Sequence, residues 1–217
     1  MTTRLQLRTT IREFLEDLAT TGSPLWSDAA LNEYLAAAMR AYGAHFPRQA
    51  TAATDPVTAA ATSVALPAGL LATEIVAVRD ASGSDVPRAS QRTGPAPSDA
   101  TGGTRRVIQA WSAWAGTLRL QRPAAGDEVG VWTIDHLTGR ELAGDDVSQQ
   151  PVESGDEPIV VALAAAQAMK RRLVEDAKRG VPLAGPAAAV ATFTAEAERL
   201  IAGRKRHVRG SFTTLAS

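Results

Sequence analysis

The chain has 217 residues, of which 45% are hydrophobic and 5% aromatic, and its 23 basic residues balance 23 acidic ones. A neutral chain lacks the strongly basic face of a dedicated nucleic-acid binder, and the absence of cysteine excludes disulfides, thiol catalysis and thiolate metal sites. The charged N-terminal sequence is unlike a signal peptide, and no run reaches the ~18 apolar residues of a membrane span. We therefore expect a soluble protein made and used inside a cell, without a membrane partner.

Two helices are predicted at the N-terminus. The first presents an apolar face over residues 7–18 and is expected to end at Gly22, a residue type suited to left-handed geometry. The second begins after Ser27, a good N-cap, with Trp26 before it as a hydrophobic staple. It should end at Pro47, because a proline forces the preceding residue out of helical geometry.

A region of short strands is predicted next. Residues 48–63 are expected to form a polar linker, and residues 91–104, with three glycines and two prolines, a flexible surface loop. Between and after them, strand-like runs alternate with turn sequences, which predicts a meander with antiparallel pairing. These runs are "SVAL", "TEIVAVRD", "RRVIQAW", "GTLRLQ" and "DEVGVWTIDHL". Trp111 and Trp132 are expected in the core of this module, whereas Trp114 is either core or an exposed subunit contact.

Two further helices are predicted near the C-terminus. One runs from about residue 158 to Gly180, and the other has Pro186 at a plausible first helical position and Gly203 as its stop. After Gly203 the chain carries four basic residues, no acid and few apolar residues. That composition predicts an extended tail that does not fold alone.

The predicted fold class is α+β, a four-helix bundle with an inserted antiparallel β module. The bundle combines an N-terminal helical pair (1–47) with a C-terminal pair (151–203), the β module with its loops spans 48–150, and the basic tail spans 204–217. The residues expected to be largely buried in the bundle are Leu7, Ile11, Phe14, Leu15, Leu31, Tyr34, Leu35, Tyr42, Leu163, Leu173, Phe193 and Leu200.

The sequence offers no pattern typical of an enzyme. His45, His136 and His207 are scattered, and no spacing matches a zinc, iron or calcium motif. The nine acidic residues between positions 127 and 157 are typical of a solvated surface. A DNA-binding helix-turn-helix is disfavoured, because the break between the first two helices is too long for that motif. We expect no catalytic, cofactor or metal site.

Three stretches carry a resemblance to a known family. "WSDAALNEYLAAAMRAYGAHFP", "SVALPAGLLATEIVAV" and "LRLQRPAAGDEVGVWTIDHL" resemble the capped helix, strand pair and strand–turn–strand of tailed-bacteriophage head–tail connector (adaptor) proteins, over most of residues 4–178. The resemblance implies a structural virion protein, made in the host cytoplasm and found in the neck. It would form a ring, a dodecamer in this family, between the portal protein and the next neck or tail protein, around the DNA channel.

The resemblance also suggests two sets of site residues. The C-terminal tail is expected to dock on the portal through four basic residues and two apolar anchors, rather than bind channel DNA or have no role: Arg204, Lys205, Arg206, Arg209, Phe212 and Leu215. Asp145 and Asp146 are expected either to line the channel, where they would repel DNA, or to lie on an outer loop. Another neck or tail-completion protein, or a cellular interaction module unrelated to phage, remains the alternative function.

Overall fold

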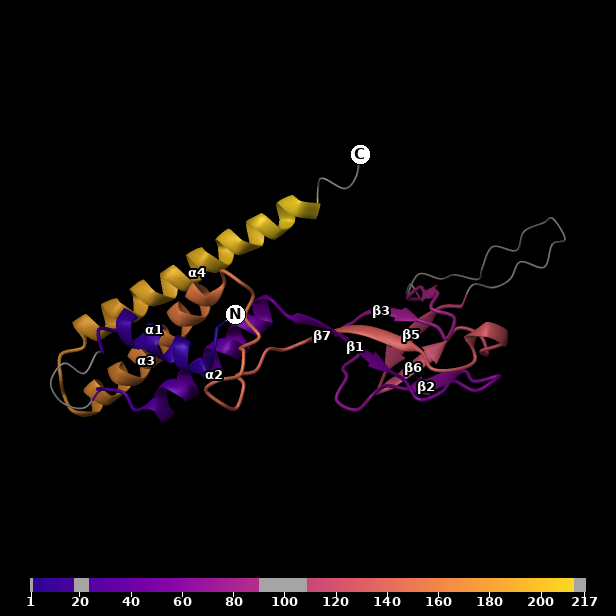
Figure 1. Ribbon diagram of the computed structural model, residues 1–217, viewed down its shortest axis with the longest axis horizontal. Coiled ribbons are helices and arrows are strands. Elements are labelled where there is room, and N and C mark those ends of the chain that lie inside the picture. Colours follow the sequence, from indigo (N-terminus) through magenta and orange to yellow (C-terminus); the bar gives the residue numbers. More distant parts are fainter. Residues whose placement is uncertain (1, 18–23, 90–108, 213–217) are drawn as a thin grey trace. The chain divides into compact units, whose positions relative to one another are not determined.

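The computed structural model describes residues 2–17, 24–89 and 109–212 and, within them, shows an α+β protein with four α-helices and two antiparallel sheets (Figure 1). The mixed fold class is confirmed. The chain divides into two compact units: a helical unit of Met1–Pro47 with Gly139–Ser217, and a β unit of Arg48–Thr138. In the described ranges, no helix combines the length and the apolar character that crossing a membrane requires.

Helix α1 (Arg4–Phe14) is shorter than predicted. The expected stop, Gly22, lies outside the described residues, and the chain already leaves helical geometry at Glu16, whose φ is +53°. The Asp17 carboxylate then accepts the Leu25 N–H at 2.6 Å. This bond ties the residue just before the second helix to the end of the first. The periodicity of a single helix cannot reveal such a contact.

Helix α2 (Asp28–His45) begins and ends as predicted. The Ser27 Oγ accepts a hydrogen bond from the Ala30 N–H at 3.2 Å, which satisfies one of the free donors of the first turn. Trp26, just before the cap, is buried within the helical core, as the staple requires. The helix stops just before Pro47.

Helix α3 (Glu157–Lys178) is the central helix of its unit and packs against α1, α2 and α4. Its N-terminal half is apolar on every side, which is typical of a helix surrounded by others. Many of these positions are alanines, so neighbouring backbones can approach closely. The buried residues are Ile159, Val160, Val161, Ala162, Ala164, Ala165, Ala166, Ala168 and Met169.

Helix α4 (Ala184–Phe212) corrects the predicted C-terminus. It does not stop at Gly203 but continues through residues 204–212, so the expected extended tail is wrong for that stretch. Arg204 forms an ion pair with Asp156, the N-cap residue of α3, which shows that α4 runs antiparallel to α3. A glycine inside a helix costs ~1 kcal/mol, and packing plus this ion pair outweigh that cost.

The β unit contains two small antiparallel sheets that share one core. Trp111 and Trp132 are 2% and 0% exposed, which confirms their predicted place there. A short 3-10 helix, η1 (Gly126–Glu128), precedes the last strand. The first sheet has the order β1 (Arg48–Ala53), β7 (Thr133–Thr138), β3 (Ile75–Arg79), β4 (Asp85–Val86), and the second has the order β2 (Ser63–Ala65), β6 (Thr117–Leu120), β5 (Trp111–Trp114).

The β unit spans Arg48–Thr138, whereas the β module was predicted over 48–150. The first residues of the expected linker form strand β1, which pairs with β7 along its whole length, with Arg48 opposite Thr138. The sequence "RQATAA" has no alternation of apolar residues, so only pairing with β7 makes it a strand. Residues 139–150, expected in the β module, belong to the helical unit. The predicted loop 91–104 lies outside the described residues.

Five of the twelve residues predicted to be largely buried in the bundle are buried in the structure. Leu7, Ile11, Leu31, Leu35 and Tyr42 are at most 1% exposed. Phe14 is 43% exposed, so its assignment to the core is wrong. The remaining members of the set are half-buried: Leu15, Tyr34, Leu163, Leu173, Phe193 and Leu200.

Candidate interaction surfaces

The predicted portal-binding residues divide into two groups in the structure. Arg204 and Lys205 lie within α4 and contact their own unit: the Arg204 Nε lies 3.1 Å from the Asp156 carboxylate, and the Lys205 Nζ lies 3.2 Å from the His45 Nδ1. Arg206, Arg209 and Phe212 belong to the last helical turns, and Leu215 lies outside the described residues. The first two are thus engaged in holding α4.

Asp156, the partner of Arg204, lies at the centre of a buried polar cluster. It is 4% exposed and accepts a hydrogen bond from the Tyr42 hydroxyl at 2.7 Å. The same hydroxyl accepts the Glu153 N–H at 3.4 Å. Burial, followed by the hydrogen bond to Asp156, raises the pKa of Tyr42 far above its ordinary value, so the phenol stays a donor. The cluster joins α2, α3 and α4.

Arg140 fixes the connection from the β unit to α3 onto the end of α2. Its guanidinium donates to the Phe46 and Pro151 carbonyls at 2.7 and 2.5 Å and to the Glu153 carboxylate at 2.8 Å, and it lies 5.2 Å from the centre of the Tyr42 ring. Arg140 is 6% exposed. This arginine was not singled out from the sequence, because its partners lie at distant positions of the chain.

The two aspartates predicted to line a channel both have partners within the helical unit. Asp146 accepts hydrogen bonds from the Arg4 Nε at 2.6 Å and from the Arg8 Nη2 at 2.9 Å, and these arginines, Arg8 first, lower its pKa. Asp145 accepts the Ser148 hydroxyl at 2.7 Å and backbone N–H groups of its own turn, and this lowers its pKa. Both therefore organise the loop that carries them.

Arg4 and Arg8 begin a row of three arginines along α1, spaced one helical turn apart. The third, Arg12, binds the Asp17 and Asp28 carboxylates, each at 2.7 Å. The hydrogen bond from Arg12 is the largest effect on Asp28 and lowers its pKa. The row therefore ties α1 to the start of α2 and to the loop before α3. Periodicity placed the apolar face of α1 but gave no sign of this second face.

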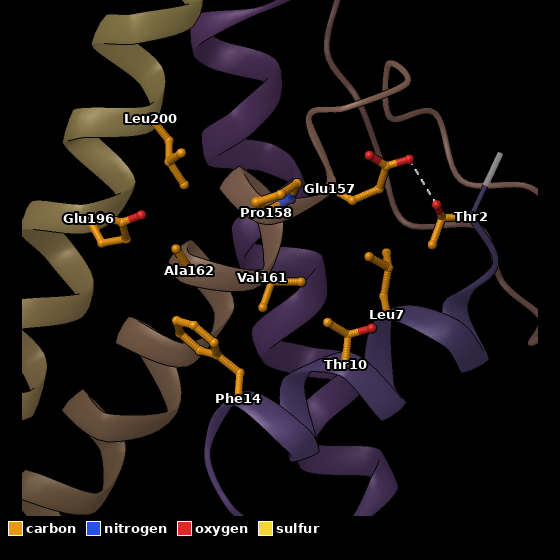
Figure 2. Close-up of a pocket in the computed structure, with 10 residues that line it drawn as sticks. All are labelled: Thr2, Leu7, Thr10, Phe14, Glu157, Pro158, Val161, Ala162, Glu196 and Leu200. Carbon is orange, nitrogen blue, oxygen red and sulfur yellow. Dashed lines mark hydrogen bonds between the residues drawn. The ribbon is translucent and has the colours of Figure 1, made fainter.

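An apolar groove opens between α1 and α4 above α3. We call it the α1–α4 groove; it encloses about 320 Å³. Figure 2 shows Phe14 of α1 and Leu200 of α4 reaching toward it from opposite sides, with Ala162 of α3 between them. Its lining consists of Thr2, Leu7, Thr10, Phe14, Glu157, Pro158, Val161, Ala162, Glu196 and Leu200.

The sequence did not predict this groove. Leu7, Phe14 and Leu200 were all assigned to the core, because a stripe of apolar residues looks the same whether a second helix covers it or not. Phe14 is exposed although its ring contacts that of Phe193 at 5.2 Å between centroids. At this point, therefore, no other helix covers the apolar face of α1. The groove can be recognised only from the positions of α1 and α4 on α3.

A separate exposed aromatic residue lies on the β unit. Trp114 is 71% exposed at the end of β5, beside the tight turn of Ala115 and Gly116, whose φ values are +49° and +74°. It therefore belongs to the surface rather than the core of the sheet, which decides between the two predicted positions. Its role as a subunit contact remains a prediction.

The described side chains show no grouping of the kind a metal centre needs: among them, no three histidines or acids lie together. His45 lies at the end of α2 and His136 lies in β7. In comparisons with known proteins, no protein-family model matches the chain, and no curated protein matches it in sequence.

Proposed function

We propose that the chain is a structural subunit of a bacteriophage neck: a head–tail adaptor that forms a ring under the portal protein. The observation that carries the proposal is the interruption of the helical unit by a β unit between α2 and α3. This order is the one that the family resemblance implies. The capped helix after Trp26, α2, supports the proposal.

The architecture suits a subunit whose task is contact with other proteins. We regard the helical unit as a four-helix bundle in which α3 is the core and α1, α2 and α4 face outward. A ring needs two different complementary patches on every subunit. The α1–α4 groove and Trp114, one on each unit, are two exposed apolar features available for such contacts.

In this proposal the subunit has three kinds of neighbour in the virion: the portal, adjacent copies of itself, and the next neck or tail protein. A dodecamer would match the portal of this family. Docking on the portal through the C-terminal residues stays a prediction for the set named from the sequence: Arg204, Lys205, Arg206, Arg209, Phe212 and Leu215. The proximity of Asp145 and Asp146 to channel DNA stays a prediction as well.

The experiment is reconstitution with the portal protein of the same virus. Purified chain and portal rings are mixed and separated by sedimentation, and attached rings are imaged by electron microscopy. We expect one adaptor ring on each portal ring. Failure to attach to the portal at any concentration, combined with a defined assembly in its absence, would overturn the proposal.

A truncation separates attachment from folding. Removing residues 206–217 keeps Arg204 and its ion pair with Asp156, so the helical unit should melt as the full chain does. The truncated chain should nevertheless lose stable attachment to the portal. Arg204→Ala is the matched comparison, because it leaves the C-terminus in place and removes the ion pair with Asp156. This variant should lower the melting temperature of the helical unit, whereas the truncation should not.

A further inference from the structure

The α1–α4 groove has the character of a receptor for an apolar segment. Its floor is made of small and branched apolar side chains of α3, Val161 and Ala162, beside Pro158. Phe14 on one wall is 43% exposed, so part of the wall is apolar surface in contact with water. Covering such surface is favourable in proportion to its area. A groove between two helices also suits a segment presenting apolar residues about one turn apart.

The charged side chains that line the groove are all acidic. Its lining includes two carboxylates, Glu157 and Glu196, and no basic residue. Glu157 accepts the Thr2 hydroxyl and the Gly155 N–H, and Glu196 pairs with Arg199. An acidic segment would meet like charge there, whereas a basic one would not. The preferred occupant therefore combines apolar side chains with positive charge.

The C-terminal segment of this chain, residues 206–217, has that composition. It reads "RHVRGSFTTLAS", with Arg206 and Arg209 but no acid, and with Phe212 and Leu215 three residues apart. It follows directly on the part of α4 that is held to its own unit through Arg204. The segment is thus attached at one end to a point that the Arg204–Asp156 ion pair holds to the helical unit.

The segment cannot fill the groove of its own molecule. Leu200 is the groove residue of α4 nearest the C-terminus, and Phe212 lies twelve helical residues beyond it, about 18 Å along the axis. From Phe212, three residues reach at most about 11 Å even when fully extended. Leu215 therefore falls short of its own groove, and an occupant must come from another copy.

We propose that the C-terminal segment of one subunit binds in the α1–α4 groove of a neighbouring subunit, with Phe212 and Leu215 as the buried anchors. Donor and receptor are different surfaces of the same chain, so the contact is head-to-tail and leads to a ring or an open chain rather than a symmetric dimer. The inference deepens the proposed function by naming one self-association contact, but it does not depend on a phage origin.

A peptide of residues 206–217 with a fluorescent label tests the receptor directly. It is titrated with the full-length chain, and binding is followed by fluorescence anisotropy. Thr10→Arg places a cation on the groove, whereas Thr9→Arg adds the same charge to the same helix at an exposed position outside the lining. We expect the first variant to weaken binding roughly tenfold or more, a change of about 1.4 kcal/mol or more, and the second to bind as the wild type does.

The anchors are tested in the peptide. Replacing Phe212 and Leu215 together by alanine should abolish binding, while replacing Thr213 and Thr214 by alanine should leave it unchanged. Melting curves establish that both arginine variants fold like the wild type. Absence of peptide binding up to millimolar protein, or equal binding by the two arginine variants, would overturn the inference.

Mixing two full-length variants tests the head-to-tail geometry. Thr10→Arg lacks a working groove, and the Phe212→Ala, Leu215→Ala variant lacks a working anchor, so each alone should stay monomeric. Together they can form one intact contact, and sedimentation should show dimers but nothing larger. A mixture that stays monomeric contradicts the geometry. Should the anchor variant fail on the portal while the peptide does not bind the groove, the segment serves the portal alone and the proposed function survives.

Discussion

Asp146 makes the helical unit sensitive to acid. Hydrogen bonds from Arg8 and Arg4 lower the pKa of its carboxyl below the ordinary value. A carboxyl with a lowered folded pKa contributes stability above its unfolded pKa of about 3.9, and this contribution is lost as the pH falls through the folded value. We therefore expect the free energy of unfolding of the wild type to fall more steeply below about pH 5 than that of Asp146→Asn.

The comparison uses urea unfolding at neutral and acidic pH. Glu13→Gln is the matched control, because it also removes one acid near α1, is exposed, and takes part in no described ion pair. The control should follow the wild-type pH profile. Parallel profiles for Asp146→Asn and the wild type would show that the arginine contacts contribute nothing measurable.

Tyr42 contributes through one hydroxyl group. It donates to the buried Asp156 carboxylate, and Tyr42→Phe leaves that carboxylate with Arg204 alone. A hydrogen bond to a charged group is worth roughly 1.5–3 kcal/mol, and we expect a loss of that order in the free energy of unfolding. Tyr34→Phe serves as the reference: no described hydrogen bond involves that hydroxyl, so its loss should change stability by less than ~0.5 kcal/mol.

At the scale of the element, two glycines in helices should respond in opposite ways to alanine. A Cβ at Gly203 meets nothing within 4 Å, whereas at Gly43 it would lie 2.6 Å from the Arg140 backbone nitrogen. Gly203→Ala should therefore raise the free energy of unfolding by roughly 0.5–1 kcal/mol, and Gly43→Ala should lower it. Denaturant midpoints measure both. A destabilised Gly203→Ala would mean that α4 ends there after all.

Local signals predicted the elements whose boundaries depend on neighbouring residues. The cap at Ser27 and the stop at Pro47 gave α2 at both ends. Elements that depend on a distant partner were missed. Strand β1 exists because β7 pairs with it, and α4 passes Gly203 while a distant aspartate binds the next residue.

The candidate surfaces were predicted less well than the elements, for the same reason. Composition marked the basic C-terminal residues and the acidic loop. In the structure, however, Arg204 binds Asp156 and Asp146 binds Arg8, so both charges have partners within the helical unit. Charge along a sequence does not say whether its partner is in the same molecule. The α1–α4 groove left no mark at all, because its walls carry the pattern of an ordinary core.

At the scale of the whole molecule, the two units have separate hydrophobic cores. Leu35 and Ile134, one in each core, are both 0% exposed. Truncation to alanine should cost ~2–5 kcal/mol in the unit concerned. We expect Leu35→Ala to lower the midpoint temperature of the unfolding transition followed by far-UV circular dichroism, which reports the helices. Ile134→Ala should lower the midpoint temperature followed by tryptophan fluorescence, because three of the four tryptophans lie in the β unit.

Each variant acts as the control of the other. If the units fold independently, a change in one core leaves the other transition where it was. Both probes shifting together in both variants would show a single cooperative unit and would contradict the division. Calorimetry of the wild type, which resolves one transition or two, is the independent check.

The pairing of Arg48 with Thr138 has a consequence for the evolution of this chain. Directly opposed residues of antiparallel strands lie about 5 Å apart, so the β unit leaves the helical chain and returns to it at nearly the same point. Loop-closure entropy depends on keeping two ends together, and a folded insert with adjoining ends does this by itself. To the helices, the whole β unit is equivalent to a tight turn. A two-residue Asn-Gly hairpin in its place, or an unrelated domain with adjoining termini, should leave them folded, so the site is open to the exchange of one module for another.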